Sequence, residues 1–191
     1  MILVLAVMAV SCSNNDTKTA STASGAGDSA AKKQSFFRVT AYLKGQLQSI
    51  KGNGVTPIKY TTVNGRTDSA FIKFEDLDST AKEFTATLID STNLVGFFSE
   101  SKFLDQTINA FTYTYDPIQK LPDSVLLQHW DVYIDPEKGK VKRVYIIKKN
   151  RQGKTLQLTW VNNEWFNTTT IKTNSDGTTA VEKEEKISWA Y

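Results

Sequence analysis

The fold is decided by residues 122–167, which read PDSVLLQHWDVYIDPEKGKVKRVYIIKKNRQGKTLQLTWVNNEWFN. Apolar and polar residues alternate here, and many side chains are β-branched or aromatic, the types that suit a pleated surface. Turn-forming residues interrupt the pattern at 135–140, 150–153 and 162–163. Asp followed by Pro opens a tight turn, and Gly and Asn tolerate the positive φ that hairpins need. The stretch therefore predicts four antiparallel strands joined by three hairpins.

The turns also predict which residues face one another across the strands. We expect residues 135 and 140 to close the first hairpin, residues 149 and 154 the second, and a two-residue turn the third. This pairing gathers most large apolar side chains on one face, because residues two apart share a face. We call this set the aromatic row: Trp130, Val132, Ile134, Val141, Tyr145, Ile147, Leu156, Leu158, Trp160 and Trp165. Arg143 falls beside Trp160 in the row, where its guanidinium is expected to stack on the indole.

Helices are predicted ahead of these strands. Phe36, Val39, Leu43, Leu47 and Ile50 follow three- and four-residue steps, which places them on one helical face. Helical spacing over residues 75–88, and a cap at 90–91 before residues 93–103, predict further helices. From residue 108 onward we expect about six antiparallel strands. The predicted class is α+β, with N-terminal helices packed on an antiparallel β-meander of about six strands.

The N-terminus carries a different signal. Residues 1–11 read MILVLAVMAVS and precede Cys12. The apolar run has the length of a signal-peptide hydrophobic region and is too short to span a bilayer. The sequence Ala9-Val10-Ser11-Cys12 resembles the lipobox of bacterial lipoproteins. This resemblance implies that residues 1–11 are removed as a signal peptide, and that Cys12 is the acylated, lipid-bearing first residue of the mature protein.

The segment after Cys12 fits that layout. Residues 13–35 are dominated by Ser, Thr, Ala, Gly and Asn and contain no large apolar residue, which is typical of a flexible tether. We therefore expect a signal peptide at 1–11, a lipidated cysteine and tether at 12–35, and a single α+β domain at 36–191. The layout places the domain in the periplasm or at the cell surface, anchored to a membrane, with the outer membrane expected. The alternative is a short buried strand with Cys12 in a core.

Composition excludes several classes of function. A net charge of +3 is too small to indicate nucleic-acid binding. With one Cys and one His, the chain has few ligands for a metal, and it contains no phosphate-binding loop or dinucleotide fingerprint. We expect no metal, no cofactor and no enzymatic activity. His129 and Asp131 point to the same face and resemble a proton-transfer pair, but we interpret them as a histidine in a partly covered sheet beside a solvated carboxylate.

Two sets of residues are candidates for binding. Basic residues gather in the two hairpins that flank residues 141–149, where they are expected to contact anionic lipid headgroups or glycans, or else to keep the hairpins soluble. The aromatic row is expected to be covered by the helix at 36–50, and the alternative is a platform for sugars or an apolar guest. The candidates are Lys140, Lys142, Arg143, Lys148, Lys149, Trp130 and Trp160.

The chain is also similar to small lipoproteins of unknown function from Gram-negative envelopes, in the phrase VYIDP at residues 132–136 followed by Lys140 and Val141. We therefore predict a non-enzymatic, lipid-anchored envelope protein that binds or scaffolds a partner, either an envelope protein or an anionic glycan or headgroup. The alternative is a carrier of a small ligand or lipid on the concave face of the sheet. A deep apolar cavity between helices and sheet would favour the carrier, and a filled core would favour the scaffold.

Overall fold

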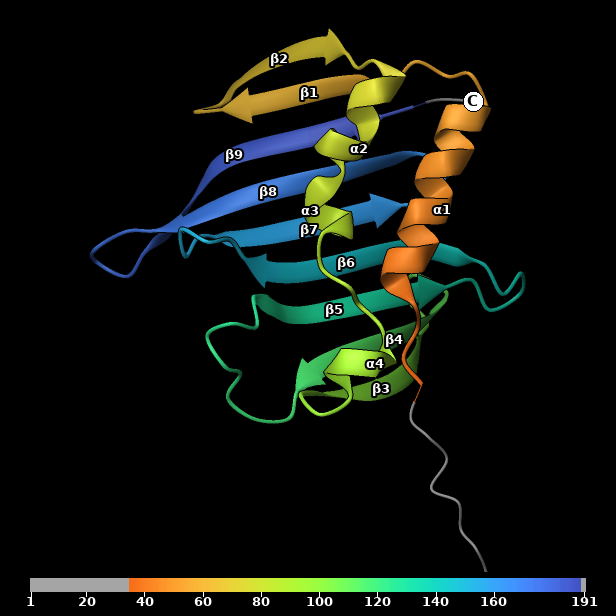
Figure 1. Cartoon of the computed structure of the whole chain (residues 1–191), viewed down its shortest axis with the longest axis vertical. Coiled ribbons are helices and arrows are strands. Elements are labelled where there is room, and N and C mark those ends of the chain that lie inside the picture. The colour runs from red at the N-terminus through yellow and green to blue at the C-terminus, as the bar shows by residue number, and fades with distance from the viewer. Residues whose placement is uncertain (1–34, 190–191) are drawn as a thin grey trace, which may run out of the picture. The chain divides into compact units, whose positions relative to one another are not determined.

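A computed structural model describes residues 35–189, which fold into one antiparallel sheet with helices on one side (Figure 1). The predicted signal peptide, Cys12 and the tether as far as residue 34 lie outside the described residues.

The sheet has nine strands in the order β2-β1-β9-β8-β7-β6-β5-β4-β3. From β3 to β9 each strand pairs with the next in sequence, and the hairpin of β1 and β2 adds to the free side of β9. The strands are β1 (Ile58–Val63), β2 (Arg66–Phe71), β3 (Phe98–Asp105), β4 (Ala110–Pro117), β5 (Leu127–Ile134), β6 (Val141–Lys149), β7 (Thr155–Val161), β8 (Trp165–Thr173) and β9 (Thr179–Ser188).

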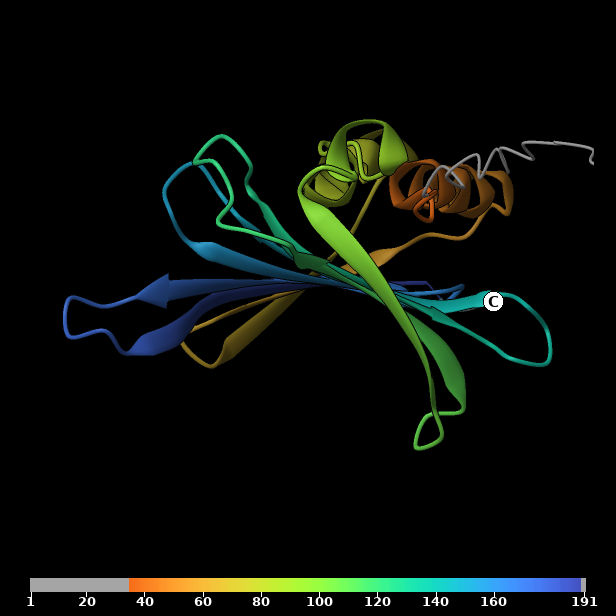
Figure 2. The same ribbon diagram turned by 90° about the horizontal axis from the view of Figure 1, so that it is seen from below.

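Helices cover one side of this sheet only, as Figure 2 shows. They are α1 (Val39–Gly52), η1 (Phe74–Asp76), α2 (Leu77–Thr80), α3 (Lys82–Thr85) and α4 (Ser91–Leu94). The predicted stripe of α1 is confirmed, because Val39, Leu43, Leu47 and Ile50 are all buried. We call the side of the sheet under the helices the helix face and the other side the open face.

The core lies between the helices and the helix face. Trp130 of β5 packs against Phe36, with ring centroids 5.9 Å apart, and stacks on Tyr115 of β4 at 4.5 Å. Trp160 of β7 packs against Phe84 of α3 at 5.5 Å. Aromatic pairs in these arrangements add to the burial energy of their large surfaces. Rings from helices and strands therefore fill the space between the two layers.

The chain is predominantly β, which corrects the predicted class. The six strands expected from residue 108 onward are β4 to β9. Residues 55–63, which the sequence leaves open between an edge strand and a loop, contain β1, whereas β2 and β3 were not predicted. The predicted helix over residues 93–103 is mostly wrong. Asp90 does cap α4, accepting a hydrogen bond from the Thr92 amide at 2.9 Å, but the helix stops at Leu94. All eight residues of β3 pair with β4, so tertiary pairing overrides local propensity.

The predicted pairing is confirmed at the first turn, which residues 135 and 140 close, but it is wrong by one residue beyond the bulge of that hairpin and throughout the other two. Ile134 does face Val141, but a β-bulge beside Tyr133 shifts the next pair, so Val132 faces Val144. The second and third turns each contain one residue more than predicted, which pairs Lys149 with Thr155 and Val161 with Trp165. Since side chains alternate between faces, each slip moves residues to the opposite side of the sheet.

The aromatic row is therefore split between the two faces. Its buried members include Trp130, Val132, Leu156, Leu158 and Trp160, which lie on the helix face with Val144, Ile146 and Phe166. Tyr145, Ile147 and Trp165 lie on the open face, together with Arg143.

Candidate functional site

The open face is the largest surface of the sheet that no helix covers (Figure 2). One line of residues crosses it at a common level, because each is the direct partner of the next. In order from β3 to β8 these are Phe103, Thr112, Tyr133, Arg143, Val161 and Trp165. Ser188, Ile58 and Phe71 continue the line across β9, β1 and β2. Six of these nine side chains are aromatic or apolar, and they extend across the uncovered face.

Two cations stack on aromatic rings along this line. The Arg143 guanidinium lies 4.1 Å from the centre of the Tyr133 ring, and the Lys186 ammonium lies 4.6 Å from the Trp165 ring. We call Tyr133, Arg143, Val161, Trp165 and Lys186 the open-face stripe. Among the described residues, neither cation forms an ion pair with a carboxylate. The predicted contact of Arg143 with Trp160 is wrong, because register places them on opposite faces.

A shallow depression lies next to the Arg143 stack. The bulge between β5 and β6 skips Lys142, whose ammonium donates a hydrogen bond to the Ile108 carbonyl at 2.8 Å. The depression has a volume of about 190 Å³. Its lining residues are Ile108, Ala110, Tyr133, Lys142, Arg143 and Val161. Lys142 and Arg143 therefore flank a depression whose other lining residues are mostly apolar.

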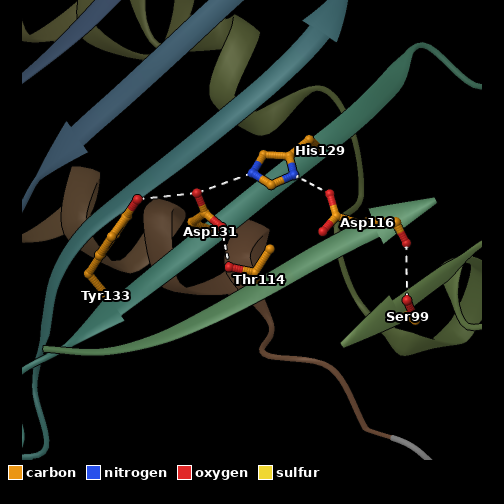
Figure 3. Close-up of polar contacts among 6 residues, drawn as sticks. All are labelled: Ser99, Thr114, Asp116, His129, Asp131 and Tyr133. Atoms are coloured by element: carbon orange, nitrogen blue, oxygen red, sulfur yellow. Dashed lines mark hydrogen bonds and ion pairs between the residues drawn. The ribbon is translucent and has the colours of Figure 1, made fainter. Parts of the chain in front are cut away.

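A polar network occupies the neighbouring part of the open face (Figure 3). His129 lies between two carboxylates, with Nδ1 2.8 Å from Asp116 Oδ1 and Nε2 3.1 Å from Asp131 Oδ2. Asp131 also accepts hydrogen bonds from the Thr114 hydroxyl at 2.7 Å and the Tyr133 hydroxyl at 3.2 Å. Tyr133 thus belongs to both the network and the open-face stripe.

The network favours a protonated imidazole. The hydrogen bond to Asp131 raises the pKa of His129, against the effect of burial, and Asp116 raises it further. Burial acts to raise the pKa of Asp131, but hydrogen bonds from His129 and Thr114 outweigh it and lower that pKa below its usual range. Both ring nitrogens face a carboxylate, so neither is free to accept a proton from a substrate.

The structure separates the predicted basic cluster. The two hairpins that carry it lie at opposite ends of β6 (Figure 1), and a nine-residue strand is about 27 Å long. Lys140 and Lys142 are exposed at one end, and Lys149 is exposed at the other. Lys148 points to the helix face, is only 5% exposed and pairs with Glu83 at 2.7 Å. It is therefore a buried structural residue.

Trp130 and Trp160, predicted as candidate binding residues, are each 0% exposed. They lie in the core and cannot contact a partner in the folded protein. The sequence did not predict that Asp116, thirteen residues from His129, contacts the His129 ring. It also did not predict that Lys186 stacks on Trp165. Strand alternation correctly placed His129 and Asp131 on one face. The same alternation puts Tyr133 on that face, but Tyr133 was not predicted as a neighbour of the pair.

No group of His, Cys, Asp or Glu side chains within residues 35–189 is arranged to hold a metal ion. Over the same residues, no helix has the length and apolar character needed to cross a membrane. Comparisons with models of protein families, with curated proteins and with solved structures found no significant match to this chain.

Proposed function

We propose that this chain is a non-enzymatic, lipid-anchored protein of the cell envelope that binds an acidic glycan on the open face of its sheet. The proposed anchor is Cys12, and the proposed location is the periplasmic or outer surface of the outer membrane. The observation that supports the glycan-binding role most strongly is the open-face stripe, where two cations lie over aromatic rings and form no ion pair with a carboxylate of residues 35–189.

Charge on the open face favours an anionic partner. Four carboxylates there have partners within the chain: His129 pairs with Asp116 and Asp131, the Asn167 amide donates to Glu184 at 3.0 Å, and the Thr107 amide donates to Asp105 at 2.9 Å. The charge of Arg143 acts on Asp105 without an ion pair between them. Arg143 and Lys186 remain available for an external anion. They stand three strands apart, on β6 and β9, which corresponds to roughly 14 Å. An extended chain with repeated negative groups fits this spacing better than a single small anion.

The aromatic members of the stripe suit a sugar ring. Tyr133 and Trp165 present flat apolar surfaces with polar tips, and such side chains contribute much of the binding energy at contact surfaces. The core gives less support to a carrier of a small ligand or lipid, because the rings of Phe36, Phe84, Trp130 and Trp160 pack on one another where a guest would lie.

The test is binding of the lipidated full chain to polygalacturonate, a linear carboxylated polysaccharide, with neutral dextran as the comparison. Arg143→Gln and Lys186→Gln should each weaken binding by about 1 kcal/mol, roughly fivefold. Lys120→Gln removes the same charge from an exposed loop outside the stripe and should change binding little. Equal effects of all three variants, or equal binding to dextran, would contradict the proposal.

A further inference from the structure

The sheet has two edge strands, and they differ in character. β2 is six residues long, exposed throughout and mostly polar. β3 is longer, contains no proline, and pairs with β4 without a bulge. It also exposes two large apolar side chains, since Phe103 is 50% and Leu104 46% exposed. A long, regular and partly apolar edge is a template for another strand.

The backbone direction shows which groups β3 offers at that edge. The Ile118 amide donates to the Phe97 carbonyl at 3.0 Å, so the backbone of Phe97 points toward β4. Backbone groups alternate along a strand, so those of Ser99, Ser101 and Phe103 point the same way. The amides and carbonyls of the remaining residues, Phe98, Glu100, Lys102 and Leu104, point away from β4 toward the free edge.

We propose that this edge pairs with β3 of a second copy of the chain, antiparallel, about a two-fold axis beside Ser101. This register places Glu100 opposite Lys102 of the second copy, twice by symmetry. It also places Phe98 opposite Leu104. A shift of two residues either way would put Glu100 opposite Glu100 or Lys102 opposite Lys102, and like charges directly opposite are destabilising. The charges therefore select one symmetric register.

Both charges can pair with a second copy. Among residues 35–189 neither Glu100 nor Lys102 forms an ion pair; the Glu100 side chain has a hydrogen bond with Tyr115, and the Lys102 ammonium lies over the Phe111 ring at 4.6 Å. A two-fold axis perpendicular to the sheet keeps both open faces on the same side. The dimer would present one continuous eighteen-stranded sheet, twice the nine strands of one copy, and this goes beyond the binding role of the single chain.

A cysteine cross-link tests the register directly. In the proposed dimer the two Ser101 residues form a non-hydrogen-bonded pair with Cα atoms about 4.5 Å apart, within reach of a disulfide. The matched control is Ser99, which is also exposed but lies about 14 Å from its counterpart. The full chain carrying Ser101→Cys or Ser99→Cys is oxidised with copper phenanthroline in intact cells, and non-reducing gels measure the dimer. The unsubstituted chain controls for Cys12.

Ser101→Cys should give several-fold more cross-linked dimer than Ser99→Cys or the unsubstituted chain. In the Ser101→Cys background, Glu100→Lys alone or Lys102→Glu alone should reduce the yield of cross-linked dimer several-fold. The two substitutions together should restore the yield, because they place opposite charges across the interface again. Equal yields at positions 99 and 101, a cross-linked product of another mass, or failure of the double exchange to restore the yield would overturn the proposal. Glycan binding is not needed for any of these outcomes, so the two proposals fail separately.

Discussion

At the scale of single residues, the four tryptophans separate the core from the surface. Trp130, Trp160 and Trp189 are at most 2% exposed and pack between the helices and the sheet. Trp165 directly precedes Phe166, which is buried on the helix face. Trp165 therefore lies on the open face, where Lys186 stacks on it. One position along a strand therefore decides whether an indole is structural or available to a partner.

Trp130→Ala should destabilise the fold by about 2–5 kcal/mol, because it removes a fully buried ring and leaves a cavity among Phe36, Phe98 and Tyr115. Trp165→Ala removes the same side chain from the open face and should cost much less. Urea unfolding of both variants measures the difference. Similar losses of stability in the two variants would contradict the assignment of faces.

His129→Gln should alter how stability depends on pH. Because the pKa of His129 is raised in the folded state, the protonated ring stabilises the fold. This stabilisation is fully present below about pH 6.5 and is lost as the pH rises through the folded-state pKa. The unsubstituted chain should therefore lose stability as the pH rises above about 6.5, and His129→Gln should lose less over the same range. Unfolding free energies at several pH values measure both slopes, and parallel slopes would show that the network holds no proton on the ring.

At the scale of elements, the chemistry of the turns was read correctly from the sequence, but the lengths of the second and third turns were not. Asp135 accepts hydrogen bonds from the amides of Glu137 and Lys138, and Gly139 has a φ of 62°, as the predicted first turn requires. The sequence does not show the bulge beside Tyr133 or the extra residue in the other two turns. These depend on how side chains pack across the finished sheet, which local patterns do not encode.

The same limit explains the missed strands. The hairpin of β1 and β2 has the turn signal Asn64-Gly65, with positive φ at both residues, but β2 buries no side chain and so shows no hydrophobic pattern. The α1 stripe was predictable because burial against a sheet demands a helical period. Most of the central fold was thus predictable, whereas the open-face stripe was not, because it depends on register.

Leu43→Ala in α1 should cost about 2–5 kcal/mol, since Leu43 is 0% exposed against the helix face. Lys44→Ala changes the exposed neighbour and should leave stability nearly unchanged. Thermal or chemical unfolding of the two variants provides the comparison. A tolerated Leu43→Ala would mean that α1 is not needed to cover the sheet.

At the scale of the whole molecule, the proposed role combines a lipid anchor with an exposed binding face. An anchored protein with an acidic-glycan site would hold a membrane and an envelope polymer together. This arrangement needs no catalytic group, and it would gain strength if two open faces acted side by side in the proposed dimer.

Cys12→Ser should release the protein from the membrane fraction when the gene is expressed with its natural upstream sequence. The unsubstituted chain should remain with membranes and take up labelled fatty acid, because the proposed lipid is attached to the Cys12 thiol. Cell fractionation and fatty-acid labelling measure both properties. Membrane retention of both versions without label would refute the anchor.

The accessibility of Trp165 tests the central claim, that the open face is the contact surface, most directly. Acrylamide quenching of tryptophan fluorescence in the full chain should show an accessible fraction that Trp165→Phe removes, since the other three tryptophans are buried. Polygalacturonate should protect that fraction in the unsubstituted chain and leave Trp165→Phe unchanged. If acrylamide quenches both proteins equally, or if the bound glycan gives Trp165 no protection, the open face is not the contact surface.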